Sequence, residues 1–326
     1  MLAPMDGITD APMRALQGAT GAFTYTVSEF LRVSGEPIPA KVFLRDVPEL
    51  ARGGATASGL PVQVQLLGGD PGRMATSAAT ACKAGARGID INFGCPAPTV
   101  NRHDGGASLL NHPCRIREIV ATVRKAVPAG IPVSAKLRLG WESIEAIYEN
   151  AAMAAEGGAS WLTIHARTRV QGYAPPVYWK PIRQVREALG LPVIANGDIW
   201  TFEDLQRCRD ETGCRHFMIG RSALADPSLP HRIALELGIG GRDVETNWMA
   251  LFQALADLIG EPKRALTRLK QWIKIAHLYG DFPYFHELKR AETLAEFFEA
   301  LQRFYAADAT LPQPLPEREG SSQCPR

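Results

Sequence analysis

The sequence predicts an α/β fold, a (β/α)8 TIM barrel followed by a small domain built only of helices. Short apolar segments rich in Val and Ile alternate with amphipathic segments of helical periodicity up to about residue 241. The apolar segments recur every 20 to 45 residues or so, which is roughly the size of a βα unit. Beyond Gly241 the helical periodicity continues, but no further strand-like segment follows.

The predicted strands come first. Eight segments have the composition of buried parallel strands: Leu2–Met5, Phe23–Val27, Val62–Leu66, Gly88–Phe93, Val133–Leu137, Trp161–His165, Val193–Asn196 and His216–Ile219. The chain begins inside the first of these segments, so we expect its natural start a few residues upstream. An open, doubly wound parallel sheet is the alternative arrangement. No G-x-G-x-x-G or G-x-x-x-x-G-K-[ST] motif follows any of the strands, which weakens that alternative.

Helices are predicted between the strands. The clearest segments are Pro71–Ala84, Cys114–Ala126, Ser143–Glu156, Lys180–Leu189 and Thr201–Arg209. Residues 1–241 therefore form the predicted barrel. Residues 242–308 form the helical domain, in which apolar residues such as Trp248, Phe252 and Leu255 recur at helical spacing. Residues 309–326 hold four prolines without apolar periodicity, and we expect them to form a disordered tail.

The composition excludes several classes of protein. The chain of 326 residues is 46% hydrophobic and 21% charged with a net charge of +2, so a nucleic-acid surface would have to be local. Six cysteines without a C-x-x-C pair or a histidine cluster indicate neither a zinc site nor a disulfide framework, and the acidic residues show no metal-ligand spacing. We expect no bound metal. Without a signal peptide or an apolar segment of about 18 residues, we expect a cytoplasmic protein with no membrane association.

The predicted strand ends are unusually polar. In a barrel the carboxyl ends of all strands lie on one face, where active sites are found. The polar or ligand-approaching residues at these ends are Asp6, Gln65, Asn92, Cys95, Lys136, Arg138, His165, Asn196, Gly197, Asp198, Gly220 and Arg221. A single polar residue at a strand end is ordinarily solvated or paired. So many together indicate a ligand site, because buried polar groups need partners.

The last two strand ends suggest which ligand this is. Gly197 and Gly220 allow the backbone to approach a ligand closely, and Arg221 offers two parallel donors to a phosphate. Loops after the seventh and eighth strands commonly bind phosphate in this fold. Lys136 and Gln65 would then face the middle of the ring. A planar, phosphorylated, electron-accepting cofactor fits this arrangement, and we expect flavin mononucleotide (FMN).

The segment Ile89–Gly106 contains the candidate for chemistry. Pro96 and Pro98 end the strand, which places Cys95 at its carboxyl end, before a long loop. Most cysteines of this kind are buried and inert, so the segment alone leaves both interpretations open.

Several motifs together resemble the tRNA-dihydrouridine synthases. They are Ala3–Asp10 (APMDGITD), Gln63–Leu66 (QVQL), Asn92–Pro96 (NFGCP), Lys136–Arg138 (KLR), His165–Thr168 (HART), Asn196–Asp198 (NGD) and Ile219–Arg221 (IGR). The segments Asn92–Gly106 and Lys136–Trp141 look most like the bacterial C-type subfamily. The resemblance implies an FMN-dependent barrel with a helical tRNA-binding domain, which reduces uridine 16 of the tRNA D-loop with NADPH as the reductant.

The resemblance also implies a role for each matching residue. Cys95 would donate a proton to C5 of the uracil after a hydride from reduced FMN reaches C6, and Asn92 and Arg138 would contact the base. The residues implied to bind FMN are Pro4, Met5, Asp6, Gln65, Lys136, His165, Asn196, Gly197, Asp198, Gly220 and Arg221. Asp198 departs from the family pattern, since many members have Glu there.

A basic helix predicted between Pro262 and Gly280 suggests where tRNA binds. Five Lys or Arg residues and no acid occur within it. At about 100° per residue, Lys270 and Lys274 share one stripe, and Arg268 flanks it. We expect these three residues to bind tRNA and Arg32 to extend the surface toward the pocket. A plain solvated face is the alternative.

Two other functions remain open from the sequence. A flavin barrel acting on a small molecule, of the dihydropyrimidine or dihydroorotate dehydrogenase type, would leave the basic helix unexplained. A non-catalytic RNA-binding protein would lack flavin. We expect the protein itself to be a monomer.

Overall fold

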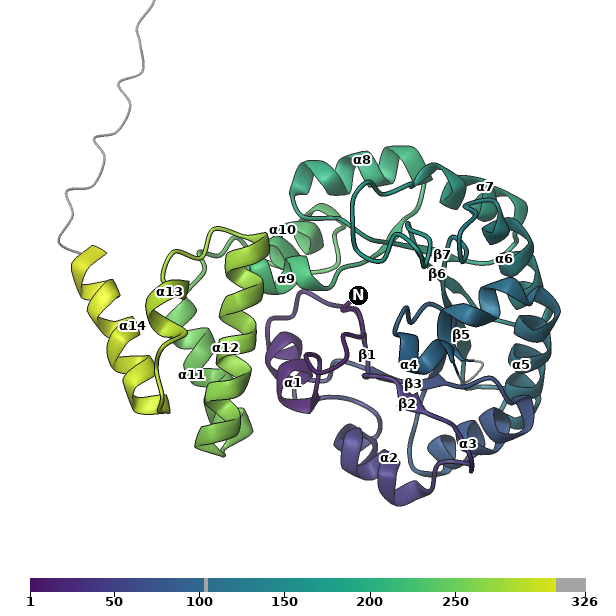
Figure 1. The fold of residues 1–326 in the computed structure, drawn as a ribbon, viewed down its shortest axis with the longest axis horizontal. Helices are drawn as coiled ribbons and strands as arrows, with labels where there is room; N and C mark the ends of the chain where they lie inside the picture. Colours follow the sequence, from purple (N-terminus) through teal and green to yellow (C-terminus); the bar gives the residue numbers. More distant parts are fainter. Residues whose placement is uncertain (103–104, 309–326) are drawn as a thin grey trace, which may run out of the picture.

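The computed structural model describes residues 1–102 and 105–308, with side chains described as far as residue 306. The predicted tail at 309–326 lies outside the described residues. The architecture is the predicted one: a parallel sheet curled into a barrel, followed by helices (Figure 1).

The strands form a continuous ring. They are β1 (Thr26–Val27), β2 (Leu31–Arg32), β3 (Val62–Leu67), β4 (Ile89–Asn92), β5 (Val133–Arg138), β6 (Leu162–His165), β7 (Val193–Asn196) and β8 (His216–Met218). Their order in the sheet runs β1-β3-β4-β5-β6-β7-β8, and Leu2 bridges to both Thr26 and Ile219 in parallel fashion. Met1 and Ala3 on either side of Leu2 also hydrogen-bond to the Ile219 backbone. Residues 1–3 therefore close the barrel, and the alternative of an open doubly wound sheet is wrong.

The first two predicted strands differ from the structure. The segment Leu2–Met5 forms parallel bridges at Leu2, beside which the Ala3 N–H donates to the Ile219 carbonyl, and it does not continue as a strand. Pro4 has no N–H to donate, and the Met5 backbone instead turns back to bond with Thr9. The second strand stops at Val27 and resumes as β2, which also pairs with β3. Four residues lead from Val27 to Leu31 where β3 spans three, so one extra residue makes a bulge, which the sequence did not predict.

Helices cover the outside of the ring (Figure 1). The predicted ones are observed with small shifts as α3 (Pro71–Lys83), α5 (Pro113–Ala126), α6 (Ala146–Glu156), α7 (Lys180–Ala188) and α8 (Phe202–Thr212). Local sequence explains their limits: at α8, Thr201 and Asp204 form a capping box, and Gly213 ends the helix in a left-handed conformation. The remaining helical segments of this part are α1 (Ala11–Ala19), α2 (Ala40–Asp46), η1 (Pro48–Arg52), α4 (Pro98–Asn101), η2 (Gly106–Asn111), α9 (Arg221–Ala225) and α10 (Leu229–Glu236).

The main hydrophobic core lies between the sheet and these helices. Strand β3 is buried along its whole length, as expected of parallel strands covered on both faces. Helix α5 contributes Ile116, Ile119, Val120 and Val123, which recur on one side of the helix and are fully buried. This packing holds the ring rigid, so the residues at its strand ends have fixed positions.

The C-terminal helices form a group beside the ring (Figure 1). They are α11 (Trp248–Ile259), α12 (Pro262–Tyr279), α13 (Phe285–Leu288) and α14 (Leu294–Asp308). A second apolar cluster fills the group with Phe252, Trp272 and Phe297, and continues onto Met13 and Leu224 of the barrel. Barrel and helices thus share packed surface, and a division at residue 241 stays a prediction. None of the helices described here has the length and apolar character needed to cross a bilayer.

Candidate active site

A pocket of about 400 Å³ opens at the carboxyl ends of the strands. The residues predicted from the strand ends all line it: Pro4, Met5, Asp6, Gln65, Asn92, Cys95, Lys136, Arg138, His165, Asn196, Gly197, Asp198, Gly220 and Arg221. Sites for small molecules in proteins span roughly 300–1,000 Å³, so this pocket has the size of a cofactor site. Within the described residues, no group of three His, Cys, Asp or Glu side chains could hold a metal ion.

Cys95 is held in place by the side chain of Asn92. The Asn92 Oδ1 atom accepts hydrogen bonds from the backbone N–H groups of Gly94 and Cys95, both at 2.9 Å. Asn92 Nδ2 donates to Gln65 Oε1 at 2.9 Å, and Gln65 Nε2 donates to Asp90 Oδ2 at 2.7 Å. A buried hydrogen-bonded chain therefore runs from the sheet interior to the backbone of the cysteine. Asn92 uses both ends of its amide within the protein, and this reduces what it can offer to a ligand.

The Cys95 thiol is half-buried and keeps its proton. Burial raises the pKa of the thiol, and a hydrogen bond from the Ala97 backbone only partly offsets this. A raised pKa is the opposite of what an activated cysteine nucleophile needs. The arrangement suits a thiol that donates a proton.

Two further groups in the pocket are also desolvated. Burial lowers the pKa of Lys136 to about 8, with Arg138 adding repulsion. Burial and then the neighbouring cations hold the pKa of His165 well below its usual value, so this imidazole is neutral. Its buried Nδ1 has no hydrogen-bond partner among the described residues. Nitrogen atoms in this state indicate a missing polar ligand.

Arg138 connects two loops around the pocket. Its Nε donates to the Gly94 carbonyl at 2.9 Å, and its Nη1 donates to the carbonyls of Thr168 and Gly172 at 3.0 and 2.7 Å. These bonds join the Cys95 loop to the loop after β6. Three of the five N–H donors of a guanidinium are thereby committed, and the Tyr173 side chain also hydrogen-bonds to Arg138.

The far end of the pocket is formed by the loops after β7 and β8. Gly197 has φ +111°, and a Cβ there would lie 3.4 Å from the His165 ring. Asp198 follows at φ +49°, and both of its carboxylate oxygens accept bonds from the buried Arg167, one of them at 2.9 Å. The Asp198 carboxylate is thus engaged by the protein itself. Arg221 differs, because no hydrogen bond or ion pair within the described part of the chain involves its guanidinium, and its five donors are available to an anion.

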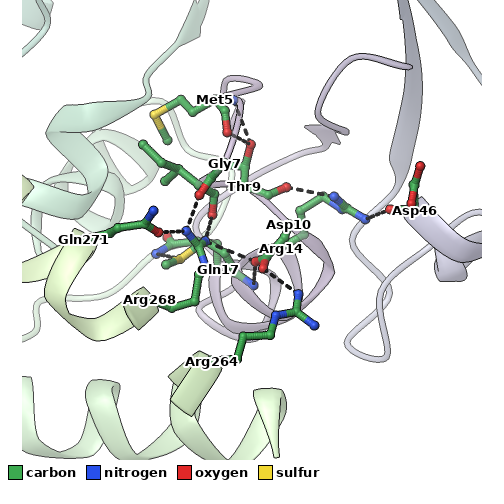
Figure 2. A network of polar contacts seen from close by, with 12 residues as sticks. Met5, Gly7, Thr9, Asp10, Arg14, Gln17, Asp46, Arg264, Arg268 and Gln271 are labelled. Atoms are coloured by element: carbon green, nitrogen blue, oxygen red, sulfur yellow. Dashed lines mark hydrogen bonds and ion pairs between the residues drawn. The ribbon is translucent and has the colours of Figure 1, made fainter. Parts of the chain in front are cut away.

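The residues predicted to bind nucleic acid do not form one surface. The structure corrects the expectation for Arg268, whose buried side chain donates to the carbonyls of Gly7 and Ile8 and to Asp10 Oδ1 (Figure 2). Arg268 thus joins α12 to the segment Gly7–Asp10, which leads into α1. Arg264 adds a bond to Asp10 at 3.1 Å. Arg32 lies apart from α12, at β2, where it donates to the Thr99 carbonyl at 3.3 Å.

Lys270 and Lys274 remain on the outer side of α12. Lys274 is exposed and Lys270 is half-exposed. Glu296 of α14 lies near enough that its pKa is lowered, first by a hydrogen bond from the Glu292 backbone and more weakly by the charge of Lys270. The stripe that is free of acids within its own helix therefore has one acidic neighbour from another helix.

Comparison with known proteins decides the family. A family model described as "Dihydrouridine synthase (Dus)" matches residues 1–310. The chain belongs to the dihydrouridine synthase family. It is 44% identical over 305 residues to a tRNA-dihydrouridine(16) synthase of Ralstonia nicotianae, covering 93% of this chain and 91% of the relative. The protein of the same name from Shewanella oneidensis is 43% identical over 309 residues, covering 93% and 97%.

Solved structures with little sequence similarity share the fold. The old yellow enzyme homologue from Zymomonas mobilis superimposes with a TM-score of 0.50 at 14% identity, covering 77% of this chain and 91% of that one. Histamine dehydrogenase from Rhizobium sp. 4-9 superimposes with a TM-score of 0.54 at 15% identity, covering 79% of this chain and 48% of that one. At 14–15% identity these similarities show the fold alone.

This family member also has pocket residues that sequence reasoning missed. Phe30, Tyr173, Trp200 and Tyr279 line the pocket as well. Phe30 lies in the bulge between β1 and β2, three residues beyond the predicted strand Phe23–Val27, whereas Tyr279 is the last residue of α12 and follows no predicted strand end. For Tyr173 and Trp200 the sequence did offer a signal, since they lie in the loops after β6 and β7.

Proposed function

We propose that this synthase reduces a uridine of the tRNA D-loop to 5,6-dihydrouridine, at position 16, using FMN and NADPH. The observation that carries the proposal is the pocket itself, in which the protonated Cys95 thiol shares one cavity with Lys136 and Arg221. The substrate and its position come from relatives that bear the name tRNA-dihydrouridine(16) synthase and align over more than nine-tenths of this chain.

The residues of the pocket fit FMN. The phosphate would bind the free donors of Arg221 beside the backbones of Gly197 and Gly220, where a Cβ would touch His165 at 3.4 Å or crowd Ala3 and Met5 at 3.2 Å. The unpartnered Nδ1 of His165 and the ammonium of Lys136 offer polar contacts to the carbonyl-rich ring. A cation near that ring stabilises its reduced, anionic form. Binding of such a group would also favour the protonated state of Lys136.

The chain's own residues supply the remainder of the chemistry. Reduced FMN, when bound, provides a hydride for C6 of the uracil. Cys95 gives its thiol proton to C5, which the raised pKa of this thiol permits at neutral pH. An N–H group of Arg138 outside its three bonds to backbone carbonyls can donate to a uracil carbonyl, while the bond to Gly94 holds the loop that carries Cys95. The base must leave its stack to enter, which costs a few kcal/mol and is easier in a loop than in a duplex.

Mapping of dihydrouridine tests the proposal directly. Transfer RNA from a strain lacking this protein should contain uridine in place of dihydrouridine at position 16, and a plasmid copy should restore the modification. The purified protein with FMN and NADPH should modify that tRNA and leave free uracil and orotate unchanged. Unaltered modification in the deletion strain, or turnover of free uracil or orotate instead of tRNA, would reject the assignment.

A further inference from the structure

Helix α12 reaches the pocket with its last residue, Tyr279. Two contacts fix this end of the helix on α9, the short helix that begins at Arg221. The buried Trp272 indole donates to the Leu224 carbonyl at 2.8 Å. A Cβ at Gly280 would lie only 2.6 Å from the Ala225 carbonyl oxygen, so the two backbones are in close contact. The position of Tyr279 relative to Arg221 is therefore set by the docking of the C-terminal helices.

Three aromatic rings surround the Arg221 guanidinium. Its central carbon lies 4.6 Å from the ring centre of Tyr279, 4.7 Å from Tyr173 and 5.2 Å from Trp200. Tyr279 and Trp200 stack on each other, with ring centres 4.9 Å apart and planes 10° apart. Trp200 is itself fixed, because its backbone N–H donates to Asp204 at the start of α8.

These rings can orient the guanidinium without consuming its donors. A cation is attracted to the face of an aromatic ring, whereas the N–H groups of arginine point outward in the plane of the guanidinium. The rings hold the side chain in one place and leave its hydrogen-bonding edge free. No carboxylate within the described residues pairs with Arg221, so the available partner is an anionic ligand.

We propose that Tyr279 is a positioning residue for the phosphate end of the cofactor site, supplied to the barrel by the C-terminal helices. This inference rests on the proposed function, which places the FMN phosphate at Arg221. A phosphate of the RNA backbone has the same chemistry, so the test must separate the two sources. The C-terminal helices then complete the cofactor pocket in addition to any contact that they make with tRNA.

Binding of FMN and of riboflavin to the full-length protein tests this inference without turnover. Riboflavin has the same ring and lacks the phosphate. Tyr279→Ala should weaken FMN binding about fivefold, the upper range for a cation–π contact at an exposed site, and leave riboflavin binding within about twofold of the wild type. Tyr279→Phe keeps the ring and should retain FMN affinity. Leu278→Ala is the matched control, since this exposed neighbour on the same turn lines no part of the pocket.

A double-mutant cycle decides whether Tyr279 acts through Arg221. Arg221→Ala alone should remove most of the preference for FMN over riboflavin, and Tyr279→Ala added to it should have no further effect. Equal losses of FMN and riboflavin binding in Tyr279→Ala, or undiminished FMN binding, would overturn the inference. Unchanged FMN binding together with weaker tRNA binding in Tyr279→Ala would also overturn it, because Arg221 would then bind a phosphate of the RNA. A wild-type protein that binds neither flavin would refute the proposed function itself.

Discussion

Asn92 shows what a residue at a strand end does once its neighbours are known. The motif around it implies contact with the target base. In the structure its carbonyl oxygen accepts from the Gly94 and Cys95 backbones, and its amide group donates to Gln65. The sequence could place Asn92 beside Cys95 but could not show that its hydrogen bonds are largely used internally. The partner Gln65 belongs to another strand, and contacts between strands depend on register.

The raised pKa of Cys95 leads to a prediction at this scale. Cys95→Ala should lose about 10²–10⁴-fold in dihydrouridine formation, the usual contribution of general acid catalysis. Binding of FMN and oxidation of NADPH in the absence of tRNA should persist, because the thiol serves only the proton transfer. Rates are measured by single-turnover reduction of tRNA, with Cys114→Ala on the exposed part of α5 as the control. Wild-type rates in Cys95→Ala would assign the proton to another donor.

The titration of the same thiol gives an independent check. Because burial raises the pKa of Cys95, the thiol form should persist to a higher pH than in a free cysteine. Alkylation of Cys95 should therefore be slow at neutral pH and accelerate only in the alkaline range, whereas the exposed Cys114 is openly accessible to the reagent. Faster alkylation of Cys95 than of Cys114 at pH 7 would contradict a role as proton donor.

The two sides of helix α12 differ in their surroundings. Its inner side packs on the second apolar cluster. Through Arg268 it also binds the carbonyls of Gly7 and Ile8, just before α1 (Figure 2). Its outer side carries Lys270 and Lys274. The sequence separated apolar from basic positions correctly but assigned Arg268 to the basic side. At about 100° per residue the Cα of Arg268 lies between those of the buried Trp272 and Ile275, so the buried side of α12 is wider than the apolar residues chosen from the sequence indicated.

We predict that the outer side of α12 binds tRNA. Replacing Lys270 and Lys274 together by Glu should weaken tRNA binding and reduce its dependence on salt. With fewer phosphate contacts, binding of tRNA releases fewer counterions. The affinity for FMN should not change. The matched control replaces Lys83 and Lys125 by Glu and so changes the net charge by the same amount. Both are exposed lysines near the ends of α3 and α5. If both double variants affect tRNA binding to the same extent, net charge is responsible and the stripe is a solvated face.

At the scale of the whole molecule, topology explains how much the sequence could predict. Once eight strands are assigned to a parallel barrel, their carboxyl ends must meet, and residues as distant as Asp6 and Arg221 line one pocket. Tyr279 could not be placed in this way. It reaches the pocket only because the C-terminal helices dock on α1 and α9, and such docking depends on surface complementarity that periodicity does not encode.

The closure of the barrel at Leu2 has a consequence for cofactor exchange. Neighbouring strands such as β5 and β6 pair through four residues, whereas Leu2 pairs through one bridge on each side. The cooperative cost of local opening should therefore be lowest along this seam, and its amides should exchange with solvent sooner than those of β5. The pocket is lined from both sides of the seam, by Ala3 to Asp6 and by Met218 to Ser222.

A ligand that contacts both sides of the seam should stabilise the closed barrel there. Hydrogen exchange followed by mass spectrometry should show fast deuteration at residues 1–5 and 218–222 in the free protein, and saturating FMN should slow it there more than elsewhere. Equal protection of the seam and of β5 before ligand is added would show that one bridge is enough. If exchange follows the expected pattern, bound FMN stabilises the closed barrel by contacting both sides of the seam.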